Sequence, residues 1–162
     1  MVCYPWFGTI DYLEDELNWN RYRNVKNTKK INYNCGGYAL GTFSWYLPIF
    51  DYDDDDTTYG FEDWEEAEEK TWRCVQVMKI EFRRRGLRVI ESVTELVENE
   101  YAIAFRLSSD GDFHFLRRNS NGQWYHKRGN APYIERISVD EVYSDVWVDR
   151  YDGPMVLLAM GK

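Results

Sequence analysis

A chain of 162 residues is the length of one domain and is long enough to bury about two thirds of its unfolded surface. Its composition, 44% hydrophobic and 17% aromatic, excludes a disordered chain or a low-complexity fibre. The formal net charge of −8 disfavours sequence-independent binding to nucleic acids and to anionic membranes. No apolar run approaches a membrane span, and Met1 to Ile10 lacks the features of a secretory signal, so we expect a cytoplasmic protein.

The N-terminal part of the chain predicts helices. The first ~30 residues indicate a short charged helix and then a basic loop. From Cys35 to Leu47 the apolar residues favour a buried helix, with Asn34 as its N-cap and Pro48 at its end. Because glycine costs up to ~1 kcal/mol relative to alanine inside a helix, we infer that some group approaches this backbone closely. The glycines concerned are Gly36, Gly37 and Gly41.

An acidic run from Asp51 to Asp56 follows this helix. Its carboxylates, together with Glu62, match several positions of a calcium-binding loop, but Asp56 stands where that loop requires glycine. A solvated, self-repelling loop is therefore the expected structure, and calcium binding is the alternative.

A long helix is predicted from Phe61 to Arg85, closed by Gly86, because apolar residues recur at three- and four-residue steps. We interpret residues 51–86 as an acidic loop and an outer helix inserted into a single domain that spans residues 1–162. Five later segments have the residue composition that is typical of β-strands: Leu87–Val93, Tyr101–Leu107, Phe113–Arg118, Gln123–Lys127 and Met155–Met160.

Helices first and strands later indicate an α+β fold. We expect an antiparallel sheet of about five strands, packed against the helix that begins at Cys35, with the last segment as an interior strand.

Three side chains suit acyl-transfer chemistry: Cys35 at a helix start, His114 on a strand and His126 on the next strand of the same hairpin. The positive end of the helix favours the thiolate of Cys35. His114 can take the thiol proton and return it to a leaving amine. His126 can hold the other ring nitrogen of His114, and Asn130 is the alternative residue for this role.

The register of the hairpin decides whether the two rings meet. With Asn121-Gly122 as a two-residue loop, His126 pairs with Arg117 and its ring lies on the face opposite to that of His114. We therefore predict an irregularity between Asn119 and Gln123, such as a three-residue or five-residue loop or a bulge, that brings both rings to one face.

The cysteines and histidines show no spacing of a zinc site, so we expect no metal and no cofactor. An odd number of cysteines without an export signal also argues against a disulfide framework. The remaining cysteines, Cys3 and Cys74, are expected to have structural roles.

Three segments resemble the NlpC-type branch of the papain-like cysteine peptidases and amidases: residues 34–40 (NCGGYAL), 112–115 (DFHF) and 124–129 (WYHKRG). The resemblance implies a papain-like fold in which a cysteine opens a helix packed on an antiparallel sheet. It also implies that a strand histidine is the base and that a polar residue about twelve positions later orients it, as His126 follows His114.

The resemblance extends to the region that binds the substrate and the oxyanion. Family members carry a tyrosine shortly before the cysteine; Tyr22 is its nearest counterpart and Tyr33 the alternative. Asn34 and Gly36, on either side of Cys35, are included in this region, and the backbone N–H of Cys35 is itself a candidate oxyanion donor.

Two functions remain open. The first is a thiol hydrolase that cleaves an amide bond, in this family most often in peptidoglycan stem peptides, as a phage-type lysis protein released by a partner or as an intracellular amidase. The second is a catalytically silent binding protein of phage or viral type that keeps the same scaffold and inhibits a host protein through its acidic, aromatic surface.

Overall fold

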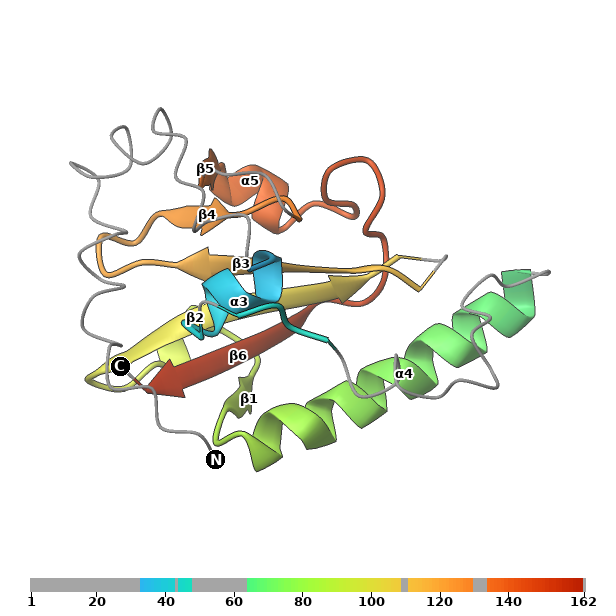
Figure 1. Ribbon diagram of the computed structural model, residues 1–162, viewed down its shortest axis with the longest axis horizontal. Coiled ribbons are helices and arrows are strands. Elements are labelled where there is room, and N and C mark those ends of the chain that lie inside the picture. The colour runs from blue at the N-terminus through green and yellow to red at the C-terminus, as the bar shows by residue number, and fades with distance from the viewer. Residues whose placement is uncertain (1–32, 43, 48–63, 109–110, 130–133, 162) are drawn as a thin grey trace.

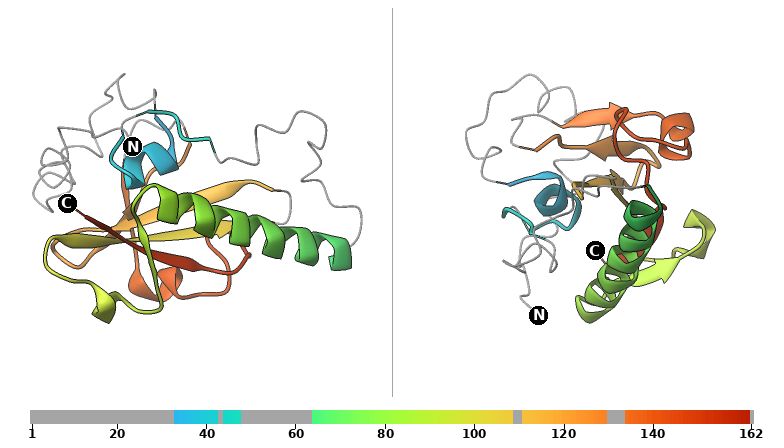
Figure 2. Two further views of the ribbon diagram at one scale, coloured as in Figure 1. Left: turned by 90° about the horizontal axis from the view of Figure 1, so that it is seen from below. Right: turned by 90° about the vertical axis from the view of Figure 1, so that its right-hand side faces the viewer.

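The computed structural model of the protein describes residues 33–42, 44–47, 64–108, 111–129 and 134–161. Within these residues a six-stranded antiparallel sheet has the strand order β1-β6-β2-β3-β4-β5 (Figure 1). Helices α3 and α4 lie on one face of the sheet and α5 on the other (Figure 2). The strands are β1 (Arg88–Ile90), β2 (Glu100–Leu107), β3 (Phe113–Arg118), β4 (Trp124–His126), β5 (Glu135–Ile137) and β6 (Val156–Gly161).

The α+β class and the antiparallel sheet are as predicted, and β3 has the predicted bounds. Strand β6 lies between β1 and β2, which confirms the interior position of the last strand. The sheet has one strand more than expected, because β5 and the following helix α5 (Val139–Val142) were not predicted. Elements of three and four residues are too short to produce a periodic pattern.

Helix α3 spans only Cys35–Ala39, so the prediction that it extends to Leu47 and ends at Pro48 is wrong. Position 48 lies outside the described residues. The helix ends early because Gly41 has a φ of 69°, a conformation that glycine adopts without steric cost. The N–H of the next residue then donates to the carbonyl of Gly37 (3.0 Å), which closes the helix as in a Schellman motif.

The start of α3 is held by the side chain of Asn34, which is the N-cap, as predicted. Its Oδ1 accepts hydrogen bonds from the N–H groups of Gly37 (3.1 Å) and Tyr46 (2.9 Å), and its Nδ2 donates to the carbonyl of Tyr46 (2.8 Å). A Cβ on Gly36 would lie 2.6 Å from that of Tyr46, and one on Gly37 would lie 1.9 Å from the carbonyl oxygen of Ser44. The group that approaches the glycines closely is thus the segment after the helix.

Helix α4 (Trp64–Arg84) lies close to its predicted bounds and ends before Gly86, whose φ is 88°. Its apolar stripe of Val75, Met78 and Phe82 is buried in the same cluster as residues of α3. The helix therefore packs on the same face of the sheet as α3. The stripe needs an apolar surface to cover it, and the sheet beside α3 provides that surface.

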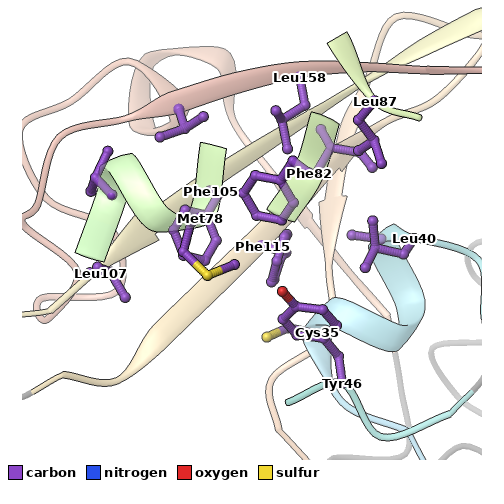
Figure 3. Packing of buried hydrophobic residues seen from close by; sticks show 14 of the residues in the cluster. Cys35, Leu40, Tyr46, Met78, Phe82, Leu87, Phe105, Leu107, Phe115 and Leu158 are labelled. Atoms are coloured by element: carbon purple, nitrogen blue, oxygen red, sulfur yellow. The ribbon is translucent and has the colours of Figure 1, made fainter. Parts of the chain in front are cut away.

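We call the face of the sheet covered by α3 and α4 the helical face. Its core is aromatic: the ring of Phe82 lies 5.3 Å from that of Phe105 and 5.9 Å from that of Phe115, in edge-to-face geometry (Figure 3). The other face, which we call the imidazole face, carries residues such as Leu116, Trp124 and Trp147 in a second buried cluster.

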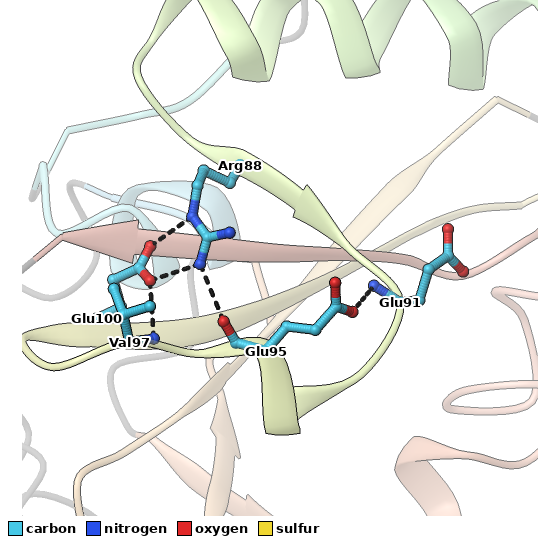
Figure 4. Close-up of polar contacts among 5 residues, drawn as sticks. All are labelled: Arg88, Glu91, Glu95, Val97 and Glu100. Carbon is cyan, nitrogen blue, oxygen red and sulfur yellow. Dashed lines mark hydrogen bonds and ion pairs between the residues drawn. The ribbon is translucent and has the colours of Figure 1, made fainter.

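The β1 end of the sheet is tied by polar contacts (Figure 4). The guanidinium of Arg88 donates to both carboxylate oxygens of Glu100 (3.0 and 2.6 Å) and to the carbonyl of Glu95 (3.1 Å). The carboxylate of Glu95 accepts from the N–H of Glu91 (2.6 Å). The pKa of Glu100 is lowered, chiefly by its hydrogen bond to Arg88.

Candidate functional site

Cys35 is the first residue of α3 and is buried against the helical face, where its side chain lies beside Tyr46 (Figure 3). Its thiol accepts a hydrogen bond from the backbone N–H of Phe115 on β3. Asn119 donates its N–H to Gln123 across the hairpin, and alternate residues of a strand point their N–H groups the same way. The N–H of Phe115 therefore points toward the β4 side of β3, beyond the last paired residues of the β3–β4 ladder. There it donates to the Cys35 thiol, at a position where a longer ladder would have a backbone carbonyl.

The hairpin contains the predicted irregularity. Arg117 pairs with Tyr125, one position away from the register of a two-residue loop. The loop therefore has three residues, and Gly122 at its end has a φ of 80°, the usual geometry of a three-residue hairpin with a bulge. The N–H of Gly122 donates to the carbonyl of Asn119 (2.9 Å), and the side chain of Asn121 accepts from the N–H of Gln123 (2.9 Å).

The shifted register brings the two histidines together. Nε2 of His114 lies 2.8 Å from Nδ1 of His126, and the ring centroids are 5.0 Å apart at an interplanar angle of 81°. Both side chains are buried. The predicted meeting of the rings on one face, within hydrogen-bonding distance, is confirmed.

The rings lie on the imidazole face. His114 pairs with Arg106 on β2, and the next residue, Phe115, belongs to the core of the helical face. Cys35 packs in that helical-face core, so the thiol meets the hairpin at the end of the β3–β4 ladder. Among the described residues, no hydrogen bond joins this thiol to either imidazole.

Burial keeps the three groups neutral. It raises the pKa of Cys35 to about 12, against which the hydrogen bond from Phe115 acts in the lowering direction. Burial and the neighbouring charges of His126 and Arg128 hold the pKa of His114 well below its usual value. Burial and Arg128 also lower the pKa of His126 to about 4. The predicted thiolate at the helix start is therefore not the resting form, because desolvation outweighs the pull of the helix end.

Three residues beside His114 were not predicted as residues of the site. The ring of Tyr151 stacks on His114, with centroids 5.0 Å apart, and its hydroxyl donates to Oδ2 of Asp112 (3.0 Å). Arg150 lies 3.1 Å from the same carboxylate oxygen. Burial and the charge of Asp112 raise the pKa of Tyr151, and Asp112 also acts to raise that of Cys35. Asp112 directly precedes β3, and only the fold brings residues 150 and 151 to it.

Two further charged residues, Arg128 and Glu135, lie beside His126. Oε2 of Glu135 is 3.9 Å from Nε2 of His126 and 3.4 Å from Nη2 of Arg128. Glu135 is opposite His126 in the β4–β5 ladder. Because β5 was not predicted, no sequence signal could have placed this carboxylate near the site.

The residues predicted to bind the substrate and the oxyanion have structural contacts. The side chain of Asn34 is engaged with the helix cap and Tyr46, and Gly36 is buried beneath Tyr46. Tyr33 is buried, and its carbonyl accepts a hydrogen bond from the ammonium of Lys127 (2.5 Å).

Several predicted features fall outside the described residues: Tyr22, Asn130, Cys3 and the acidic run 51–56. Cys74 on α4 packs against the helical-face core, in agreement with its predicted structural role. In the part of the chain that the structure describes, no three His, Cys, Asp or Glu side chains are grouped to hold a metal ion. None of the described helices is both long and apolar enough to cross a membrane.

Comparisons with protein-family models, with curated proteins and with solved structures gave no match.

Proposed function

We propose that the protein is a thiol hydrolase of the papain-like, NlpC-type class that cleaves an amide bond, with Cys35 as nucleophile, His114 as base and His126 as the residue that orients it. The observation that carries the proposal is the 2.8 Å contact between Nε2 of His114 and Nδ1 of His126, on a strand whose next residue binds the Cys35 thiol. This contact engages Nε2 of His114, so proton transfer from the thiol would have to use Nδ1.

The neutral resting state suits general-base catalysis. His114 would take the thiol proton as the sulfur of Cys35 attacks the carbonyl carbon, so that charge develops only in the transition state. The same imidazolium would then give the proton to the leaving amine as the C–N bond breaks, and water would hydrolyse the thioester. Backbone N–H groups at the start of α3, including that of Cys35, are the nearest candidates to stabilise the oxyanion.

The substrate class follows from the sequence resemblance, which favours peptide amides such as those of peptidoglycan stems. The hydrolysis of purified peptidoglycan and of general amide substrates tests the proposal. We expect the wild-type protein to release products and the Cys35→Ala variant to be slower by about 10³-fold or more. Cys74→Ala is the matched control, because Cys74 is the other free cysteine of the described chain. Full activity in Cys35→Ala would refute the role of the thiol.

A second candidate function is a catalytically silent scaffold that binds and inhibits a host protein. It is favoured by one observation: the Cys35 thiol is buried, and its pKa is raised to about 12. On this reading, wild-type protein and Cys35→Ala would both leave peptidoglycan and amides intact. Measurable hydrolysis by the wild-type protein that is lost in Cys35→Ala would exclude it.

A further inference from the structure

Glu135 faces the outer nitrogen of the second imidazole. It stands opposite His126 in the β4–β5 ladder, and its Oε2 lies 3.9 Å from Nε2 of that ring. The imidazole side chain is 3% exposed and the carboxylate side chain 27%. Arg128 lies 3.4 Å from the same oxygen, which holds the carboxylate on this side of the pair.

Only one of the two ring nitrogens that are in contact can carry a proton. A neutral imidazole carries a single N–H, so in this contact one nitrogen donates and the other accepts. If His126 carries its proton on Nδ1, it donates to Nε2 of His114, whose own proton must then be on Nδ1. His114 would have no free nitrogen for the thiol proton. If His126 carries its proton on Nε2, His114 donates from Nε2 and its Nδ1 is free to act as base.

We propose that Glu135 is a positioning residue that keeps the proton of His126 on Nε2 and thereby frees Nδ1 of His114. A negative charge beside Nε2 favours an N–H at that atom over a lone pair. At 3.9 Å the separation exceeds a hydrogen bond, so the carboxylate acts through its charge. The functional meaning of this inference rests on the proposed hydrolase activity, because the tautomer matters only if His114 accepts a proton.

Other titratable or charged groups also surround the two rings, but none of them replaces this carboxylate. Within the described chain, Glu135 is the acidic side chain in contact with His126, whereas Asp112 meets Tyr151, which is stacked on His114. The remaining groups are Arg128 after β4, Arg106 on β2, Arg150 beside Asp112, and Cys35.

The tautomers can be read directly, since the protein has only two histidines and therefore four imidazole nitrogens. We would record ¹⁵N–¹H spectra of the imidazoles at neutral pH for wild-type protein and for Glu135→Gln. The amide has the same shape, carries no charge and can donate to Nε2, so the variant should shift His126 toward the Nδ1–H form. In the hydrolysis assay we expect kcat to fall about ten-fold with little change in KM.

Glu100→Gln is the matched control. It removes the same charge from an ion pair with Arg88 at the other end of the sheet, and it should leave both the imidazole spectrum and kcat unchanged. An unchanged His126 tautomer in Glu135→Gln would overturn the inference, whatever the activity. A shifted tautomer supports it even if the wild-type protein hydrolyses nothing, in which case the proposed hydrolase activity fails separately.

Discussion

Two buried arginines on opposite faces of the sheet show how differently the two faces are built. On the helical face, Arg117 lies 3.7 Å above the ring of Tyr101 and donates to the carbonyl of Ala39 at the end of α3 (3.4 Å). On the imidazole face, Arg106 lies 4.7 Å from the ring of Trp147, and its buried Nε and Nη1 have no hydrogen-bond partner among the described residues.

The difference is that the guanidinium of Arg117 is joined to a helix end by a hydrogen bond, whereas that of Arg106 lies against an aromatic ring. A buried charge costs free energy unless it is paired and hydrogen-bonded. Arg106 pairs directly with His114 across β2 and β3, so its guanidinium is on the same face as the two histidines. The stability of variants on each face tests this comparison.

The largest effect is expected in the helical-face core. Phe82 is fully buried and touches the rings of Phe105 and Phe115, so Phe82→Ala removes a large apolar contact and leaves a cavity. We expect the free energy of unfolding to fall by about 3–5 kcal/mol in urea denaturation. A loss below about 1 kcal/mol would mean that α4 contributes little to the core.

On the imidazole face, acid should destabilise the protein through the histidines. The pKa of His126 is lowered to about 4 from 6.5, and that of His114 is lowered as well, so the unfolded chain binds more protons as the pH falls below 6.5. Stability is therefore fully present above pH 6.5 and is lost toward pH 4. His126 alone accounts for about 2 kcal/mol between pH 7 and pH 5. Urea unfolding of wild-type protein and of His126→Gln should show this slope and its reduction; equal slopes would contradict the burial of a neutral ring.

Arg117→Met should destabilise the protein by about 1–2 kcal/mol, because the carbonyl of Ala39 at the end of α3 loses a charged donor and Tyr101 loses its cation contact. Thermal unfolding followed by circular dichroism measures the effect. An unchanged melting temperature would mean that the guanidinium does not hold α3.

Arg106→Met should have the smallest effect and the opposite sign. Replacing this guanidinium by an apolar side chain removes its desolvation cost, which is the largest influence on its pKa, and loses the contact with Trp147 and the weaker attraction to Asp145 and Asp152. We expect a gain of about 1 kcal/mol in the same thermal experiment. A loss as large as that of Arg117→Met would remove the contrast between the faces.

The sequence predicted the features that depend on neighbouring residues. The N-cap at Asn34 and the bounds of β3 follow from local chemistry, and the irregular turn between Asn119 and Gln123 follows from strand alternation once the two histidines are required to share a face. The early end of α3 was missed, because nothing in the apolar pattern distinguishes a left-handed Gly41 from a helical one. The spacing of apolar residues indicates the type of secondary structure, but it carries no information about the φ angle of one residue.

The rest of the site depends on contacts between distant parts of the chain. Tyr151 reaches Asp112 across 39 positions, and Glu135 reaches His126 through a strand of three residues. The neutral state of the Cys35 thiol is also set by burial under segments that are distant in the sequence. Its position at the start of a helix had instead indicated a thiolate. Desolvation is a tertiary effect, and no local motif reports it.

The most direct test of the central claim is to trap the thioester on the nucleophile. The protein would be incubated with peptidoglycan fragments, quenched in acid, digested and analysed by mass spectrometry, alongside Cys35→Ala and His114→Ala. We predict an acyl adduct on Cys35 in the wild-type protein, none on any cysteine in Cys35→Ala, and much slower accumulation in His114→Ala. Product release without an adduct on Cys35, or at equal rate in Cys35→Ala, would contradict the account.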